Sequence, residues 1–412
     1  MPMSTDPSGA PALAGGTATT LRQRNSSAVL DIVRRASTPL RVAEIAQAAS
    51  LSRPTVETVA EGLLDQDWLL LADADDAGAP SVGRPARLYR FNERAGFVLG
   101  VDVGAHSVTV AIGDLRGGIV ATERHRVAPE LPAIERLAAT SDVIAALIAH
   151  TGIARSDILA MTVGTPGTVS PATDRVGLSP GMPGWPEVDV VGALAASVDC
   201  AIELENDANL AAVGERARGI GAGCADMVFL LLGERLGAGI IANDALVRGR
   251  NGAAGELGYV PVRGARDRDP RFGPLESRVN ASALVRMGLR AAAEHPDSAL
   301  AASAELSAGD VTLAATRGDA YASGLVRRLA RRIAHGIAPT LLTLNPELLV
   351  VGGGVSLAGE VLRSALASAI TKVVLYPPEV RLSALGDEAV VLGAVTQSLE
   401  RVEADVLARV SA

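Results

Sequence analysis

The spacing of apolar residues near the N-terminus predicts three short helices followed by two strands. Residues 21–36 are apolar at helical intervals, and further helices are expected at 41–48 and from Ser52 to about 66, separated by a three-residue turn. Residues 68–72 and 86–91 read as strands joined by a loop over 73–80. The segment 21–92 therefore predicts a winged helix-turn-helix, preceded by a disordered tail over 1–20.

From residue 93 onward, strand-like and helix-like segments alternate, which predicts an α/β fold with two similar lobes. Strands are expected at 97–101, 108–113, 117–126, 158–163, 200–204, 227–232, 237–241 and 348–351. Helices are expected at 132–150, 190–198, 210–218, 281–294, 325–344 and 389–409. We assign 93–200 together with 389–412 to the first lobe, and 201–388 to the second.

Composition narrows the classes of function. The 412 residues carry a net charge of −8, which argues against indiscriminate nucleic-acid binding by the whole surface. No apolar run reaches the roughly 18 residues of a membrane span. The two cysteines, Cys200 and Cys224, lie beside apolar strands and read as reduced structural thiols, which suits a cytoplasmic protein.

The most informative polar stretch is Glu205-Asn206-Asp207-Ala208-Asn209, which begins a helix directly after a predicted strand. Carboxylates and amides together suit a polyhydroxylated ligand, because they accept and donate hydrogen bonds to hydroxyls. A suitably placed Asp can also remove a hydroxyl proton. The alternative is that Asn206 or Asp207 only caps the helix.

Two further loops carry chemistry. Asp102-Val103-Gly104 follows a strand and precedes another, a hairpin that can wrap a nucleotide phosphate with Asp102 holding its metal. Gly164-Thr165-Pro166-Gly167 follows a buried strand and lets the backbone approach a ligand closely.

The N-terminal segment carries candidate DNA contacts. The third helix begins Ser52-Arg53-Pro54-Thr55, where Arg53 and Thr55 are expected to face the major groove. The wing tip holds Arg84, within Gly83-Arg84-Pro85, and Arg87 lies beyond it, an arrangement that suits a narrow minor groove. The alternative is a protein-interaction module or a degenerate winged helix.

The order of these motifs over 21–412 resembles the ROK family (repressors, open reading frames and kinases), which has an actin/hexokinase-like, ribonuclease H-like fold. The N-terminal module ahead of Asp102-Val103-Gly104 looks like that of the family's transcriptional repressors. In family kinases the Asp that matches Asp207 activates the sugar hydroxyl for phosphoryl transfer. The resemblance implies a sugar site made of Thr165, Pro166, Gly167, Asn206, Asp207, Glu256, Tyr259 and Glu276.

Three departures from the family kinases bear on activity. His106-Ser107 stands where kinases have Thr-Lys, and Gly233-Glu234-Arg235 stands where they have Gly-Thr-Gly. Tyr259 replaces a His that follows the Gly-Glu-x-Gly stretch, and 271–276 lacks the cysteines of the family zinc site. We therefore expect no metal, no cofactor and no use of ATP.

Three functions compete. The first is a transcriptional regulator, most simply a repressor of carbohydrate genes, that binds a palindromic operator as a homodimer or homotetramer and responds to a sugar or sugar phosphate. The second is an ATP-dependent sugar kinase with a regulatory N-terminal domain. The third is a constitutive DNA-binding or scaffold protein with a vestigial sugar pocket.

Overall fold

The structure is a computed structural model and describes residues 18–72, 87–179, 181–262, 272–303 and 305–409. The chain divides into two compact units, one made of Met1–Ala95 with Val402–Ala412 and the other of Gly96–Arg401. None of the helices in the described ranges is long and apolar enough to cross a membrane.

The N-terminal unit contains three helices and a small antiparallel sheet. The helices are α1 (Ala18–Arg35), α2 (Val42–Ala49) and α3 (Arg53–Asp65), and the strands β1 (Leu40–Arg41), β2 (Leu69–Ala72) and β3 (Leu88–Phe91) pair in the order β1-β3-β2. One apolar side of each helix faces the other helices, so the three helices bury a shared core to which β2 contributes Leu69. The helical core residues include Val29, Val33, Ile45, Val56 and Leu63. The two-residue strand β1 was not predicted from the sequence.

The turn between α2 and α3 is fixed by two serines. Ser50 adopts a left-handed backbone conformation with φ of 54°, which ends α2. Ser52 caps α3 as expected, since its hydroxyl accepts a hydrogen bond from the Thr55 amide at 3.3 Å. The predicted loop over 73–80 and the predicted wing tip Gly83-Arg84-Pro85 lie outside the described residues.

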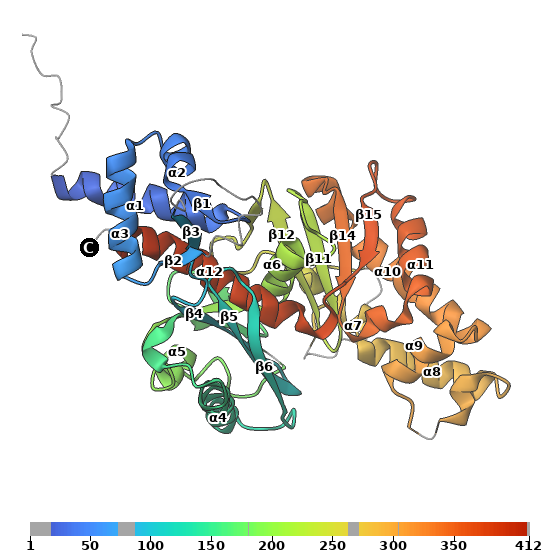
Figure 1. The fold of residues 1–412 in the computed structure, drawn as a ribbon. Helices are drawn as coiled ribbons and strands as arrows, with labels where there is room; N and C mark the ends of the chain where they lie inside the picture. The colour runs from blue at the N-terminus through green and yellow to red at the C-terminus, as the bar shows by residue number, and fades with distance from the viewer. Residues whose placement is uncertain (1–17, 73–86, 180, 263–271, 304, 410–412) are drawn as a thin grey trace, which may run out of the picture. The chain divides into compact units, whose positions relative to one another are not determined.

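The second unit holds two five-stranded mixed sheets with the same strand order (Figure 1). In the first, β4 (Phe97–Val103), β5 (Ser107–Asp114) and β6 (Ile119–Arg126) form an antiparallel meander, and β7 (Ile158–Thr165) and β10 (Ala201–Asn206) continue in parallel from β4. In the second, β11 (Met227–Leu232), β12 (Leu236–Ala242) and β13 (Ala245–Leu246) form the meander, and β14 (Leu348–Gly352) and β15 (Glu379–Leu382) continue in parallel from β11.

The helices α6 (Asp207–Arg218) and α12 (Ala389–Arg409) lie between the two sheets (Figure 1). The backbones of the two helices are in contact at Gly393. A Cβ atom added there would lie 1.8 Å from the Leu210 carbonyl oxygen, so only glycine fits at this position. The Ser398 hydroxyl on α12 donates to the Leu99 carbonyl oxygen of β4 at 2.9 Å. The assignment of 389–412 to the first lobe differs from the observed division, which places Val402–Ala412 with the N-terminal unit.

The outer faces of the sheets are covered by the remaining helices. Helices α4 (Ala133–Thr151) and α5 (Val190–Leu194) share a core with the first sheet. A separate core joins the second sheet to α7 (Glu276–Val279), α8 (Ala281–Glu294), α9 (Ala308–Thr316), α10 (Ala320–Leu344) and α11 (Glu360–Ile370). Because β10 pairs with β7, the sheet boundary falls after residue 206, and the sequence-based lobe boundary at residue 201 differs from it.

Candidate functional site

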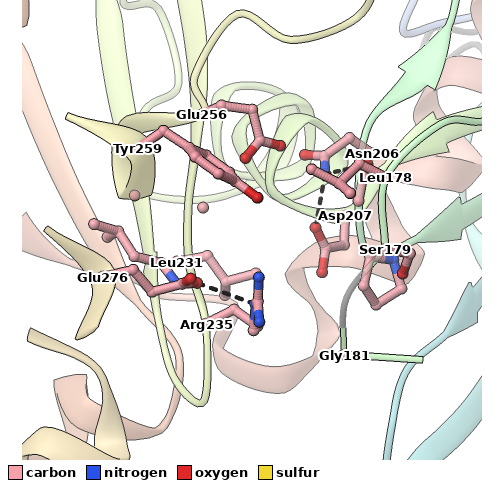
Figure 2. A pocket seen from close by; sticks show the side chains of 15 residues that line it. Leu178, Ser179, Gly181, Asn206, Asp207, Leu231, Arg235, Glu256, Tyr259 and Glu276 are labelled. Carbon is pink, nitrogen blue, oxygen red and sulfur yellow. Dashed lines mark hydrogen bonds and ion pairs between the residues drawn. The ribbon is translucent and has the colours of Figure 1, made fainter. Parts of the chain in front are cut away.

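A pocket opens where β7 and β10 of the first sheet end, opposite the β11–β12 turn of the second. It holds roughly 570 Å³ of space, counting open solvent at its mouth. Figure 2 shows Asp207, Glu256 and the Tyr259 hydroxyl directed toward the same space, with the Arg235 guanidinium facing Asp207. The lining residues are Pro166, Gly167, Leu178, Ser179, Gly181, Asn206, Asp207, Leu231, Arg235, Leu236, Gly237, Glu256, Gly258, Tyr259 and Glu276.

Asn206 and Asp207 occupy the junction between β10 and α6. The Asn206 carbonyl group of the side chain accepts from the Asn209 amide at 3.1 Å, so Asn206 caps α6. Its side-chain NH₂ donates to the Gly167 carbonyl oxygen at 2.9 Å and to Asp207 Oδ1 at 3.1 Å. Asn206 can therefore cap α6 and line the pocket at the same time.

Glu205 lies beneath this junction and braces it. Its carboxylate is 5% exposed and forms an ion pair with Arg248 Nε at 2.5 Å. Glu205 Oε1 also accepts from the Asn206 amide and from the Asn209 side chain, both at 2.8 Å. Glu205 thus holds the Asn206 backbone and the first turn of α6 in place without facing the pocket.

Asp207 and Asp102 are carboxyl groups whose pKa is raised to about 7. Burial is the main cause for each, and the Asp207 charge raises the pKa of Asp102 further. For Asp207, the nearby Glu256 also raises the pKa, while the Ala208 amide, which donates at 2.8 Å, lowers it. A carboxyl group that titrates near neutrality suits proton exchange with a ligand hydroxyl.

Glu256 and Tyr259 form the wall contributed by the segment after β13. Gly255 has φ of 89°, and a Cβ there would lie 1.9 Å from the Ala238 carbonyl oxygen of β12, so glycine is required at that position. Burial, followed by the Glu276 charge, raises the pKa of Glu256. Burial also raises the pKa of the Tyr259 hydroxyl, so it is neutral at physiological pH and can donate a hydrogen bond.

Arg235 and Glu276 face each other across the pocket floor. Arg235 Nε lies 3.1 Å from Glu276 Oε1, and the guanidinium carbon lies 5.1 Å from the centre of the Phe272 ring. Glu276, 4% exposed, also accepts from the Leu236 and Gly273 amides at 2.9 and 3.2 Å. The charge of Arg235 is therefore balanced by Glu276.

Two positions differ from the sequence-based site. Thr165 is fully buried, and its hydroxyl accepts from the Trp185 indole N–H at 2.6 Å, so it lies behind the pocket wall. Ser179 was missed: it lines the pocket, is 4% exposed, and its hydroxyl has no hydrogen-bond partner among the described residues. No local pattern marks Ser179, because it belongs to a loop that reaches the pocket only in the folded chain.

The two loops that depart from the kinase pattern meet each other. His106, on the turn after β4, places Nε2 2.9 Å from Oε1 of Glu234, on the turn after β11. The His106 turn is braced by the buried Arg136, which donates to the carbonyl oxygens of Gly104 and Ala105 at 2.8 and 3.0 Å. The Glu234 carbonyl oxygen accepts from the Asn280 side chain at 3.3 Å.

The predicted DNA-contact residues lie on the N-terminal unit. Ser52, Arg53 and Pro54 are exposed at the start of α3, and Thr55 is half-buried. Arg87 is 60% exposed and lies 3.5 Å from Glu61. Arg84 lies outside the described residues. Within the described ranges, no group of three or more His, Cys, Asp or Glu side chains could hold a metal ion.

This chain is similar in sequence to both sugar kinases and transcriptional repressors. It is 31% identical over 309 residues to a glucokinase of Halalkalibacterium halodurans, covering 72% of this chain and 92% of that protein. It is 24% identical over 391 residues to a xylose repressor of Caldicellulosiruptor bescii, covering 92% of this chain and 96% of that protein.

The fold has a close counterpart among solved structures. The crystal structure of a ROK family transcriptional regulator, a homologue of the E. coli MLC protein, superimposes with a TM-score of 0.75 at 20% identity. The alignment covers 95% of this chain and 99% of that one. The sequence profile of the ROK family matches residues 98–400, and this chain therefore belongs to the ROK family.

Proposed function

We propose that this protein is a sugar-responsive transcriptional regulator, most simply a repressor of carbohydrate genes. The N-terminal unit would act as a winged helix-turn-helix and bind a palindromic operator, with the protein as a homodimer or homotetramer in the cytoplasm. One combination of features carries the proposal. The chain joins an N-terminal unit, in which the first residues of α3 are exposed, to a sugar-kinase-like pocket whose phosphate loops differ from those of family kinases.

The geometry of the N-terminal unit supports DNA recognition. Ser52 caps α3 and leaves Arg53 exposed in its first turn, where a recognition helix presents side chains to base edges. The wing would lie between β2 and β3, with Arg87 directly before β3; Arg84, the other predicted wing contact, lies outside the described residues. Proteins with such a module derive much of their affinity from phosphate contacts, so local cations matter more than the net charge of −8.

The relatives support the same conclusion. The similarity to the xylose repressor extends over 92% of this chain, whereas the similarity to the glucokinase covers 72%. The ROK profile begins at residue 98, after the N-terminal helices. A chain in which the similarity continues into the N-terminal unit matches the repressor branch of the family better than the kinase branch.

The altered phosphate loops support a binding role rather than catalysis. The His106–Glu234 contact joins the two turns that hold nucleotide phosphates in family kinases. Glu234 places a negative charge beside the position of a triphosphate, which is unfavourable for its binding. A ligand would then be sensed by Asn206, Asp207, Glu256, Tyr259 and Glu276, with Pro166, Gly167 and Ser179 around it.

A route from ligand to α12 is available through α6. Asp207 begins α6, and α6 contacts α12 at backbone distance around Gly393. A rigid contact of this kind transmits a shift of one helix to the other. A ligand that binds two arrangements of the lobes with different affinity would thereby change the affinity for DNA, and DNA would change ligand affinity by the same factor.

An electrophoretic mobility-shift assay with the protein's own promoter DNA tests the proposal. We expect retention of that fragment, displacement by unlabelled promoter but not by scrambled DNA, and a change in affinity with at least one monosaccharide. The matched variant Arg53→Ala should lose retention, whereas Arg35→Ala, which also removes an exposed arginine of this unit, should keep it. Absence of retention by the wild type under all ligand conditions would overturn the proposal.

A second function is favoured by one observation. Asp207 matches the base of family kinases, faces the pocket and has a pKa near 7, which suits the removal of a hydroxyl proton. Coupled measurement of ADP release with hexoses, ATP and Mg²⁺ distinguishes the two. Turnover that is abolished in Asp207→Asn would establish a sugar kinase instead.

A further inference from the structure

We infer that the pocket takes an uncharged monosaccharide and rejects the same sugar carrying a phosphate. The inference rests on the proposed sugar-sensing function and narrows its ligand to one chemical class. Two features of the pocket lead to it: the lining carries carboxyl groups rather than the cations of an anion site, and it contains a hydroxyl without a hydrogen-bond partner among the described residues.

The lining of the pocket is acidic. Asp207, Glu256 and Glu276 contribute carboxyl groups, and Arg235 is the one cationic side chain among the described lining residues. The guanidinium of Arg235 is already paired with Glu276 at 3.1 Å and rests over the Phe272 ring. Proteins bind phosphate with arginine forks, lysines or free backbone amides, and this wall offers a phosphate no unneutralised cation.

The surroundings of Asp207 are also acidic. Asp102 and Asp207 interact strongly enough for the charge of Asp207 to raise the pKa of Asp102. Glu234 adjoins Arg235 and carries a further carboxylate outside the pocket. A phosphoryl group on the ligand hydroxyl that faces Asp207 would bring a dianion into this cluster, where like charges repel at low effective dielectric.

The unpaired groups suit hydroxyls. The Ser179 hydroxyl is 4% exposed on the pocket wall and lacks a partner within the described part of the chain. A buried hydroxyl without a partner costs free energy until a ligand supplies one. Together with the neutral Tyr259 hydroxyl and the carboxyl groups of Asp207 and Glu256, it forms a set of donors and acceptors that matches a polyol.

Isothermal titration calorimetry with matched pairs tests the inference. The probes are glucose, mannose and N-acetylglucosamine, each beside its 6-phosphate, at low and high salt. We expect at least one free sugar to bind and its 6-phosphate to bind at least tenfold more weakly. Because the discrimination is electrostatic, the ratio should shrink at high salt.

Two variants report on the cause of the discrimination. Glu234→Gln removes a charge from an exposed side chain and keeps its size, so the ratio of the two dissociation constants should fall by roughly two- to fivefold. Glu294→Gln removes an equal charge from the exposed end of α8 and should leave the ratio as it is. Equal ratios in wild type and Glu234→Gln would overturn the electrostatic explanation.

The outcomes separate this inference from the proposed function. A 6-phosphate that binds as tightly as its free sugar, or more tightly, overturns the inference and leaves sugar sensing intact. A panel in which neither the free sugars nor the phosphates bind overturns both.

Discussion

Nε2 of His106 lies 2.9 Å from Oε1 of Glu234, although 128 residues separate them in the chain. Each residue lies on the turn that follows the first strand of its sheet, β4 for His106 and β11 for Glu234. The two turns therefore meet through side chains. The resemblance to family kinases implies that these are the turns that would hold nucleotide phosphates. The pair carries full ionic character only when the histidine is protonated.

The first prediction concerns nucleotide binding. Replacing Glu234 by Thr, the kinase-like residue, removes the repulsive charge and the contact with His106, so affinity for an ATP analogue with Mg²⁺ should rise at least severalfold. The wild type should bind the analogue weakly or not at all, as measured by fluorescence anisotropy of a labelled nucleotide. Glu294→Gln serves as the charge-matched control. Tight nucleotide binding by the wild type would show that the contact does not exclude phosphates.

The second prediction concerns pH. The pKa of Asp207 is about 7 in the folded chain and close to 4 when unfolded, so the folded state binds more protons between these values. Its contribution to stability is therefore greatest below pH ~4, declines as pH rises to ~7 and stays low above that.

Asp207→Asn removes this titration, so its melting temperature relative to wild type should increase from pH ~4 to ~7 and then level. At pH 8 we expect the free energy of unfolding of Asp207→Asn to exceed that of the wild type by about 1–2 kcal/mol. This is less than the full pKa shift would give, because Asp207 is partly exposed and solvent screens its charge. Differential scanning calorimetry across this range measures it, with the exposed Asp142→Asn on α4 as control. A difference that does not vary with pH would contradict the assigned cause.

The sequence anticipated the elements whose signals are local. The observed bounds of β11, α8 and α12 agree with the predicted segments. Each element is marked by a local signal: a continuous apolar run in β11, the Asn280 cap before α8, and helical spacing of apolar residues in α12. The three-stranded sheet of the N-terminal unit was anticipated only in part, because β1 has two residues and no period. Helices α9 and α11 and strand β15 were not predicted.

The site shows the same limit. Asn206, Asp207, Glu256 and Glu276 line one pocket, and their binding of a sugar stays a prediction. Side-chain direction could not be read from the sequence: Thr165 points toward Trp185, and Ser179 reaches the wall from an unmarked loop. The partner of His106 was equally hidden, because it depends on how two sheets are placed in space.

The third prediction concerns DNA affinity. Arg53→Ala should weaken binding to the promoter fragment by roughly 10- to 100-fold, the usual effect of losing one specific base contact. If Arg53 reads a base, the loss should be large on the promoter and small on unrelated DNA. If it contacts only phosphate, the loss should be similar on both, and a reading role would be excluded. Anisotropy titrations with both fragments distinguish these results.

The fourth prediction concerns stability. Arg136 is 1% exposed and donates to four carbonyl oxygens, those of Gly104, Ala105, Ala128 and Pro129. Arg136→Met would leave these acceptors without their donor and should lower the free energy of unfolding by about 2–4 kcal/mol. Arg126→Met, at an exposed position on β6, should change it by less than about 0.5 kcal/mol. Equal melting temperatures for the two variants would contradict the bracing role of Arg136.

The most direct test of the central claim is the anisotropy of labelled promoter DNA bound by the full-length protein while a free monosaccharide is added. We expect the sugar found by calorimetry to change the DNA affinity at least fivefold in the wild type, and to leave it unchanged in Asp207→Ala. DNA affinity that is insensitive to every sugar that binds, or sugar-dependent release of ADP from ATP, would contradict a sugar-sensing regulator.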